Sequence, residues 1–298
     1  MREQEVRSVV VGVRDWQGRA IPHHVDPPTR TLTTVTCELG FEIVDRATLA
    51  LQLAPALSAG PVLEESLVIE LDGRALASDE VAVDHRGRIH MVQSAAGHLD
   101  VHYLAVVNTS VALATPPTAL ERLSYLRQSR YCPSDRLDGF AADEFGPVSE
   151  PYECAARISD WIFERVSYEL GSSGPLDTAI ETLLGGHGVC RDFAHLCVAL
   201  CRAVGIPARM ASVYSPGLSP MDFHAVAEVA VGDRWLVLDS TRLAPRPTLV
   251  RIGTGRDAAD TALCSTVEGY AELTTAMVGA STDTDLPYDD HLTAVAMP

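Results

Sequence analysis

The chain has 298 residues, of which 47% are hydrophobic and 21% are charged, and its formal net charge at pH 7 is −17. This length and composition fit one large or two ordinary soluble globular domains with an ample core. The strong negative charge argues against a nucleic acid or an anionic membrane as the partner, and it suits cationic or neutral peptides.

The first residues, MREQEVRSVV, contain no apolar segment of the secretory type, and no apolar run approaches about 18 residues. We therefore expect a cytoplasmic protein. Its seven cysteines are an odd number, so a disulfide framework is not expected in a reducing compartment. All 23 basic residues are arginine and none is lysine.

No metal or cofactor is predicted. The chain contains no D-x-[DN]-x-[DN]-G calcium loop. Cys197 and Cys201 lie near His195, but their spacing fits no usual zinc pattern, and we expect both cysteines to be small buried apolar residues.

Taken in chain order, residues 1–30 are polar and rich in proline, and we expect them to be loosely ordered. Short β-rich runs then alternate with turns, which predicts a small β-sandwich-like or sheet domain over residues 31–115. The runs are TLTTVTCEL, ATLALQLAP, SLVIELDG, GRIHMVQ and LDVHYLAVVN, with turns at Asp72-Gly73, Arg86-Gly87 and Gly97. Thr115-Pro116-Pro117 marks the predicted boundary to a second domain, residues 116–298.

The second domain is predicted to begin with helices and to continue with strands. Helices are expected at about Thr118–Gln128, Glu153–Tyr168 and Asp177–Leu184, and a strand at Arg209–Tyr214. After Arg256 the chain is expected to add strands at TALCST and AELTTAMVG.

Cys190 follows a flexible Gly-His-Gly turn and begins a helix that ends at Gly205. A helix N-terminus offers about half a positive charge and unpaired N–H groups, which favour a thiolate. The helical periodicity places Cys190, Cys197 and Cys201 on one face, and it gathers Arg191, Asp192, His195 and Arg202 on the other. Cys190 is therefore a candidate nucleophile at the start of the buried face.

His224 and Asp239 lie in a predicted hairpin, FHAVAEVAV-GD-RWLVLDS. If Gly232-Asp233 forms a two-residue loop, Val231 pairs with Arg234, and His224 lies diagonal to Asp239 on the same face. A three-residue loop would place them on opposite faces. An even loop length therefore predicts a histidine held by an aspartate, which is the pair that activates a nucleophile.

These motifs resemble the transglutaminase-like superfamily, whose fold is papain-like, over about Arg122 to Asp260. The matching pieces are Gly188-Val-Cys190-Arg-Asp192-Phe-Ala-His195-Leu, His224-Ala-x-x-Glu228 and Trp235-x-x-x-Asp239, with further likeness in YLRQSRYCPSD and RIGTGRDAADTA. The resemblance implies an α+β fold in which the cysteine helix packs on an antiparallel sheet, preceded by a small all-β domain. It makes residues 116–298 the catalytic domain.

The resemblance also assigns roles: Cys190 as nucleophile, His224 as base and Asp239 as the residue that orients the base. Asp192 and Glu228 recur in the family pattern and are interpreted as structural or supporting. Two residues depart from that pattern, because Val226 stands where tryptophan is common and Ser240 where proline is common. Both lie beside the triad, so they bear on substrate fit more than on chemistry. We expect the smaller Val226 to leave the histidine–aspartate pair less enclosed.

The expected function is that of a thiol enzyme that acts on amide bonds of a peptide or protein substrate through an acyl-enzyme on Cys190. Water as acceptor gives a peptidase or amidase, which is preferred, and an external amine gives a transglutaminase. A catalytically idle peptide-binding module is the alternative from another class. His187 is a rival for the base, the second oxyanion donor beside the Cys190 N–H is not identified, and the oligomeric state is left open.

Overall fold

The computed structural model describes residues 13–14, 20–21 and 31–297, which form two separate units. In the first unit, β1 (Val13–Arg14) pairs antiparallel with β2 (Ala20–Ile21). The predicted loose order of residues 1–30 otherwise falls on residues outside those described. The second unit begins at Thr31.

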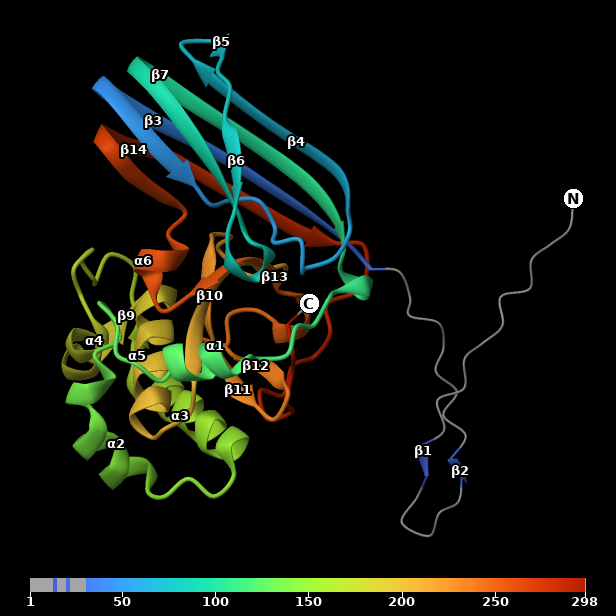
Figure 1. Ribbon diagram of the computed structural model, residues 1–298, viewed down its shortest axis with the longest axis vertical. Helices are drawn as coiled ribbons and strands as arrows, with labels where there is room; N and C mark the ends of the chain where they lie inside the picture. The colour runs from blue at the N-terminus through green and yellow to red at the C-terminus, as the bar shows by residue number, and fades with distance from the viewer. Residues whose placement is uncertain (1–12, 15–19, 22–30, 298) are drawn as a thin grey trace, which may run out of the picture. The chain divides into compact units, whose positions relative to one another are not determined.

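The strand-rich part of the second unit is one six-stranded antiparallel sheet (Figure 1). Its strands run in the order β14-β3-β7-β4-β5, and β6 also pairs with β7. The bounds are β3 Leu32–Leu51, β4 Val62–Leu71, β5 Arg74–Ala75, β6 Asp79–Ala82, β7 Arg88–Asn108 and β14 Cys264–Thr282.

Two of the expected turns are present, and the third is not. Asp72-Gly73 joins β4 to β5, and the turn at Arg86-Gly87 separates β6 from β7. Gly97 instead lies within β7, opposite Ile43, with φ +145°. Glycine tolerates this backbone conformation, so the chain does not reverse at Gly97. The strand continues and bends where the β3–β7 register shifts.

Of the two arrangements predicted for residues 31–115, a sandwich or a sheet, the structure has a single sheet, in which the expected short strands fuse into the long strands β3 and β7. This sheet packs its apolar face on strands of the other part of the unit. The shared core joins residues of β3 and β7 to Tyr214, Val250 and Ile252. The boundary at residue 116 stays a prediction, and β14, which lies beyond it, pairs along the length of β3.

A second antiparallel sheet carries the helices, with strand order β12-β11-β10-β13. Its strands are β10 Ala208–Tyr214, β11 His224–Val231, β12 Arg234–Leu238 and β13 Val250–Gly255. The helices are α1 Ala119–Ser124, α2 Asp138–Phe145, α3 Pro151–Arg165, α4 Ala179–Gly185, α5 Cys190–Ala203 and α6 Ala258–Thr261. Two short strands, β8 Ser167–Tyr168 and β9 His187–Gly188, pair in parallel.

The three predicted helices correspond to α1, α3 and α4, and the predicted strand at Arg209–Tyr214 corresponds to β10. The helix α2 was not predicted, because it is short and buries only Ala141 and Phe145. Within the described residues, no helix combines the length and apolar character needed to cross a membrane.

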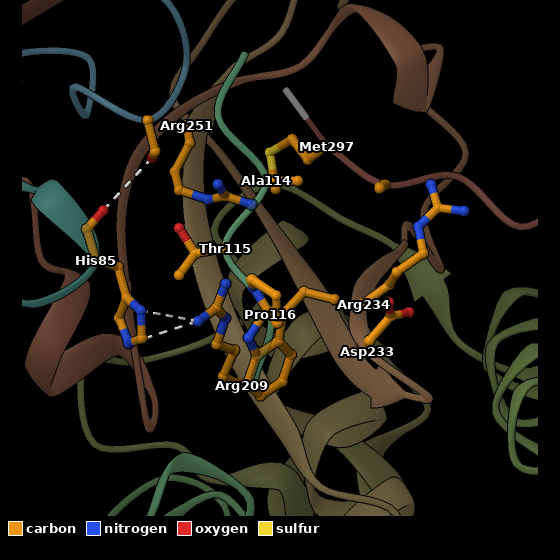
Figure 2. A pocket seen from close by; sticks show the side chains of 12 residues that line it. His85, Ala114, Thr115, Pro116, Arg209, Asp233, Arg234, Arg251 and Met297 are labelled. Atoms are coloured by element: carbon orange, nitrogen blue, oxygen red, sulfur yellow. Dashed lines mark hydrogen bonds between the residues drawn. The ribbon is translucent and has the colours of Figure 1, made fainter. Parts of the chain in front are cut away.

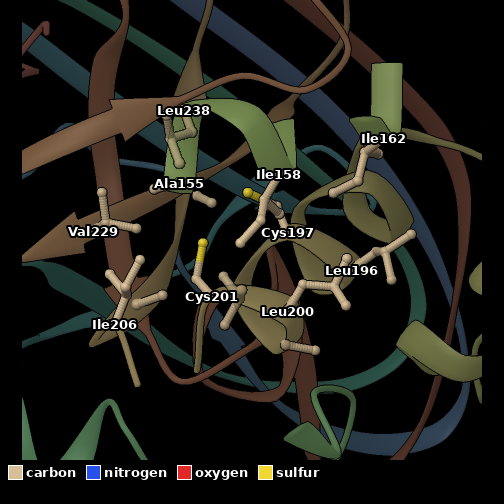
Figure 3. Close-up of a cluster of buried hydrophobic side chains, with 14 of the residues drawn as sticks. Ala155, Ile158, Ile162, Leu196, Cys197, Leu200, Cys201, Ile206, Val229 and Leu238 are labelled. Atoms are coloured by element: carbon tan, nitrogen blue, oxygen red, sulfur yellow. The ribbon is translucent and has the colours of Figure 1, made fainter. Parts of the chain in front are cut away.

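Helix α5 packs against β11, and its apolar side chains meet those of α3 and the sheet (Figure 3). Cys197 and Cys201 are fully buried in this core, as predicted, among Ile158, Leu200 and Val229. Burial of a leucine or isoleucine side chain contributes about 1.5–3 kcal/mol, so this cluster anchors the helix that begins at Cys190. The result is the expected α+β arrangement of a cysteine helix packed on an antiparallel sheet.

The other face of α5 is also buried, although its residues are polar. His195 stacks on Tyr131 with 5.1 Å between ring centroids, and its Nε2 accepts a hydrogen bond from the Ala258 N–H. Arg202 donates hydrogen bonds to the carbonyl oxygens of Arg127 and Ala208. Loops around the helix therefore satisfy polar groups that would otherwise need solvent.

Candidate active site

Cys190 is the first residue of α5, and a tight turn presents it there. The Val189 N–H donates to Asp192 Oδ2 at 2.9 Å, which caps the helix start. A Cβ on Gly188 would lie 2.7 Å from Asp192 Cβ, so only glycine allows the turn to close this tightly. Asp192 is thus structural, as interpreted from the sequence. The sulfur of Cys190 is partly exposed and lies 3.9 Å from the Phe223 carbonyl oxygen.

The hairpin that carries the histidine and the aspartate has the predicted even register. Val231 pairs with Arg234, and the pairing continues to Ala227 opposite Leu238. His224 and Asp239 consequently meet, with 2.9 Å between Nε2 and Oδ2. Both side chains are only 1% exposed. The conditional prediction of a histidine–aspartate pair is confirmed as geometry.

Asp239 is held by a residue that the sequence reasoning missed. Its Oδ1 accepts hydrogen bonds from the Thr241 N–H at 3.0 Å and the Thr241 hydroxyl at 2.7 Å. These two hydrogen bonds hold the carboxylate in one orientation, in which Oδ2 faces His224. A threonine two residues after an aspartate is a local turn signal that could have indicated this support.

The electrostatics of the pair favour an imidazolium beside an aspartate. Burial alone would lower the pKa of His224, but the Asp239 charge, its hydrogen bond and a hydrogen bond with the Cys190 thiol raise that pKa to about 10. Burial would raise the pKa of Asp239, yet His224 and Thr241 bring it below its ordinary value. The structure thus brings all three predicted residues together, with His224 between the sulfur and the carboxylate.

His187, the rival base, is placed differently. It lies on β9, half-buried, and its Nδ1 has no hydrogen-bond partner among the described residues. The imidazole that contacts the Cys190 thiol is that of His224.

The two departures from the family pattern have separate structural consequences. Val226 is buried in an apolar cluster with Val213, Val237 and Leu249, and the neighbouring His224 and Asp239 remain enclosed. The expectation that Val226 leaves the pair open is therefore wrong, because His224 and Asp239 are each only 2% exposed. Ser240 forms a hydroxyl–hydroxyl hydrogen bond of 3.0 Å with Ser159 of α3.

A pocket of about 190 Å³ lies elsewhere, where the helix-bearing sheet meets the turn at His85 (Figure 2). Arg209 and Arg251 line it, and Glu228 binds both guanidinium groups. Arg209 also lies over the Trp235 ring, with 3.9 Å from Cζ to the ring centroid, and its Nη1 is 3.1 Å from His85 Nδ1. The buried Glu228 carboxylate pairs with both arginines. Glu228 therefore has the supporting role expected from the sequence.

No group of three or more histidine, cysteine, aspartate or glutamate side chains among the described residues is arranged to hold a metal ion. The groups gathered at Cys190 are a thiol, an imidazole and a carboxylate in sequence. This arrangement can form and resolve a covalent thioester.

Comparison with known proteins gives the same assignment. Residues 139–240 match the model of the transglutaminase-like superfamily. The crystal structure of a proposed cysteine protease from Cytophaga hutchinsonii is 30% identical with a TM-score of 0.81, and the match covers 91% of this chain and 98% of that one.

Two mycobacterial proteins of unassigned function are also similar. One from Mycobacterium tuberculosis is 33% identical over 143 residues, which are 43% of this chain and 45% of that protein. One from Mycobacterium leprae is 25% identical over 148 residues, 46% of this chain and 52% of that protein. The chain thus spans about half the length of these curated relatives. Its match to the Cytophaga structure extends over nearly the whole of both chains, and the chain belongs to the transglutaminase-like superfamily.

Proposed function

We propose that this protein is a thiol enzyme that acts on amide bonds through an acyl-enzyme on Cys190, as a cysteine peptidase or amidase. The observation that carries the proposal is the convergence of three groups: a thiol at a helix N-terminus, the His224 imidazole beside it, and the Asp239 carboxylate 2.9 Å beyond. A peptide or protein supplies the carbonyl group, and no cofactor or metal is needed for this chemistry.

In the proposed reaction the Cys190 sulfur attacks the carbonyl carbon, and the π electrons of the C=O bond move to oxygen. His224 carries the proton that the thiol has given up and delivers it to the leaving nitrogen as the C–N bond breaks. Asp239 holds the imidazole in one tautomer throughout. Water then adds to the thioester with His224 as base. This step releases the carboxylic acid product and regenerates the Cys190 thiol.

Water is the proposed acceptor for two reasons. The Cytophaga relative, similar over nearly its whole length, is described as a proposed cysteine protease. In addition, this chain has no lysine, so it cannot form glutamine–lysine cross-links between its own copies. Free thiols at all seven cysteines suit the cytoplasm, which we propose as the compartment.

Hydrolysis products are expected to exceed amine conjugates when the protein acts on a peptide library in millimolar primary amine. Mass spectrometry of reactions with and without the amine measures both products. Cys190→Ala protein is the control for uncatalysed change. A clear majority of amine-conjugated product would instead establish transglutamination, and no product of either kind would favour the idle binding module.

Iodoacetamide at mildly acidic pH is expected to alkylate Cys190 first. Cys190 is partly exposed at the N-terminus of α5 beside His224, whereas burial raises the pKa of Cys37 and Cys132 to about 12. Cys264 is the internal control, since it is also only partly buried, but burial raises its pKa to about 11. Peptide mapping after short exposure measures the order, and equal labelling of Cys264 and Cys190 would contradict the proposed nucleophile.

A further inference from the structure

The pocket beside His85 has a lining whose charge differs from that of the whole protein. The chain carries a formal net charge of −17, yet Arg209, Arg234 and Arg251 all line this pocket. Among the described residues of the lining, Asp233 alone is acidic, and it lies exposed at the turn before β12. Arg209 and Arg251 are only 3% and 7% exposed, and buried arginines need partners for their donors and for their charge.

The protein itself supplies too few acceptors for these two buried arginines. Arg209 donates hydrogen bonds from Nε to Glu228 at 2.8 Å and from Nη1 to His85 at 3.1 Å, and Arg251 donates from Nη2 to Glu228. No acceptor among the described residues pairs with Arg209 Nη2, with Arg251 Nη1 or with Arg251 Nε. Figure 2 shows both guanidinium groups pointing into the pocket, near Thr115.

A third side chain of the lining repeats this pattern. The indole ring of Trp235 packs against Arg209, with 3.9 Å from the ring centroid to Cζ, and its N–H is buried without an acceptor in the described part of the chain. These unfilled groups are all donors. An occupant of the pocket therefore has to bring acceptor oxygens, because buried polar groups are normally hydrogen-bonded.

The charges at the arginines leave room for one more anion. Arg209 and Arg251 carry two positive charges, and the buried Glu228 that binds both carries one negative charge. Glu121 lies 3.6 Å from Arg209 Nη1, which is beyond hydrogen-bond range. A monoanion with two adjacent oxygens balances the remaining charge, and a carboxylate matches the planar fork of a guanidinium group.

The size of the pocket and the rest of its lining define the remainder of the ligand. The volume is about 190 Å³, which is below the roughly 300–1,000 Å³ of sites for drug-sized ligands. Ala114, Pro116, Ala296 and Met297 add apolar surface to the lining. A carboxylate that carries a short hydrocarbon chain suits both the volume and this surface.

We propose that this pocket binds a small organic monocarboxylate, which accepts hydrogen bonds from Arg209 and Arg251 and packs its hydrocarbon chain on the apolar part of the lining. No residue of the proposed catalytic triad lines the pocket, so this is a second site. The inference does not depend on the amide chemistry proposed above, since binding is measured without turnover.

Isothermal titration calorimetry of the full chain with butyrate tests the proposal. We expect saturable binding at one site. Butyramide has the same shape but no charge, and it should bind about tenfold more weakly or worse, because hydrogen bonds to an ionised acceptor are the stronger ones. Inorganic phosphate lacks the hydrocarbon chain and the planar carboxylate, and it should also bind about tenfold more weakly than butyrate.

Two variants locate the binding. Ala114→Phe places a large side chain in the pocket from an exposed position, so the fold should tolerate it and the affinity for butyrate should fall about tenfold or more. Arg251→Lys keeps a positive charge beside Glu228 but removes the fork, and it should weaken butyrate binding as well. Ala142→Phe is the matched control, since Ala142 is exposed on α2 and does not line the pocket, and its affinity should equal that of the wild type.

Each of four results would overturn the inference. Absence of saturable butyrate binding in the wild type would show that the pocket takes no such ligand. Equal affinity for butyramide would show that the arginine charges do not select the ligand. Phosphate that binds as tightly as butyrate, or more tightly, would make the pocket a phosphate site. Full butyrate affinity in Ala114→Phe would place the binding elsewhere on the protein.

Discussion

Cys190→Ala and His224→Ala are each expected to abolish turnover, with a loss of about 10⁴-fold or more in kcat. The Cys190 thiol is the proposed nucleophile, and the His224 imidazole forms a hydrogen bond with it. Groups that act as a unit show strongly non-additive losses. The double variant should therefore be scarcely worse than either single variant. Steady-state kinetics on one peptide substrate, with the circular dichroism spectrum of each variant as the folding control, measure this directly.

His187→Ala is the matched control for the choice of base, since it removes a half-buried imidazole close to the same turn. It should retain most of the wild-type kcat. Full activity in His224→Ala together with an inactive His187→Ala would show that the base was wrongly chosen. Double-variant losses equal to the product of the single losses would show that the two residues do not act together.

Asp239→Asn should leave a small residual activity and change its pH dependence. The Asp239 charge is a main reason that the pKa of His224 is raised to about 10. Without that charge the pKa of His224 falls, and the imidazolium form persists over a narrower range. The basic limb of the kcat/KM profile should then move to lower pH. A profile that keeps its basic limb near pH 10 in the variant would contradict this coupling.

The local parts of the site could be predicted from sequence because each depends on short-range patterns. Gly232-Asp233 between two β-rich runs determines the hairpin register, and that register alone places His224 on the same face as Asp239. The Gly-His-Gly turn and the apolar periodicity after Cys190 likewise predict where α5 begins.

The missing parts depend on contacts between distant segments. The strands β8 and β9 pair two residues with two, and this pairing is too short to leave a periodic signal in the sequence. The partner of β14 is β3, more than 200 residues earlier, so its place in the sheet cannot be read from local pattern. The polar residues of α5 form a pattern that is typical of a face exposed to solvent. In the structure, Tyr131 and loop carbonyl groups cover this face.

Enclosure of the histidine–aspartate pair illustrates the same limit. The small side chain of Val226 correctly indicates a difference from the family pattern, but the volume around it is filled by Val213, Val237 and Leu249 from other strands and loops. A single substitution in the sequence shows which contact is lost. It does not show which neighbours take its place.

Glu228→Gln is expected to lower the free energy of unfolding by about 3–5 kcal/mol, the usual cost of removing one partner of a buried ion pair. Glu228 is 0% exposed and lies between two arginines, with Oε2 2.8 Å from Arg209 Nε and Oε1 bonded to Arg251. Glutamine has the same shape, but its charge is gone and its NH₂ group would face guanidinium donors. The two buried cations would then lose the anion that they share, and Arg209 would keep only Glu121, at 3.6 Å.

The difference between wild type and Glu228→Gln should also depend on pH. Burial acts to raise the pKa of Glu228, but Arg209 and Arg251 bring it below its ordinary value. A carboxylate with a depressed folded-state pKa stabilises the protein above the unfolded value, about 4.3, and loses this effect as the pH falls through the folded value. Urea unfolding should thus show the full difference at pH 7 and a smaller one as the pH is lowered below 4. The control is Glu272→Gln on the exposed face of β14, which should change stability by less than about 0.5 kcal/mol at either pH.

Because Arg209 also contacts His85 at the turn beside the six-stranded sheet, the Glu228→Gln variant should loosen that junction as well. Faster amide exchange at Gly87 and Arg88 would report this loosening. An unchanged unfolding free energy at pH 7 would show that the Glu228 carboxylate only offsets its own cost of burial.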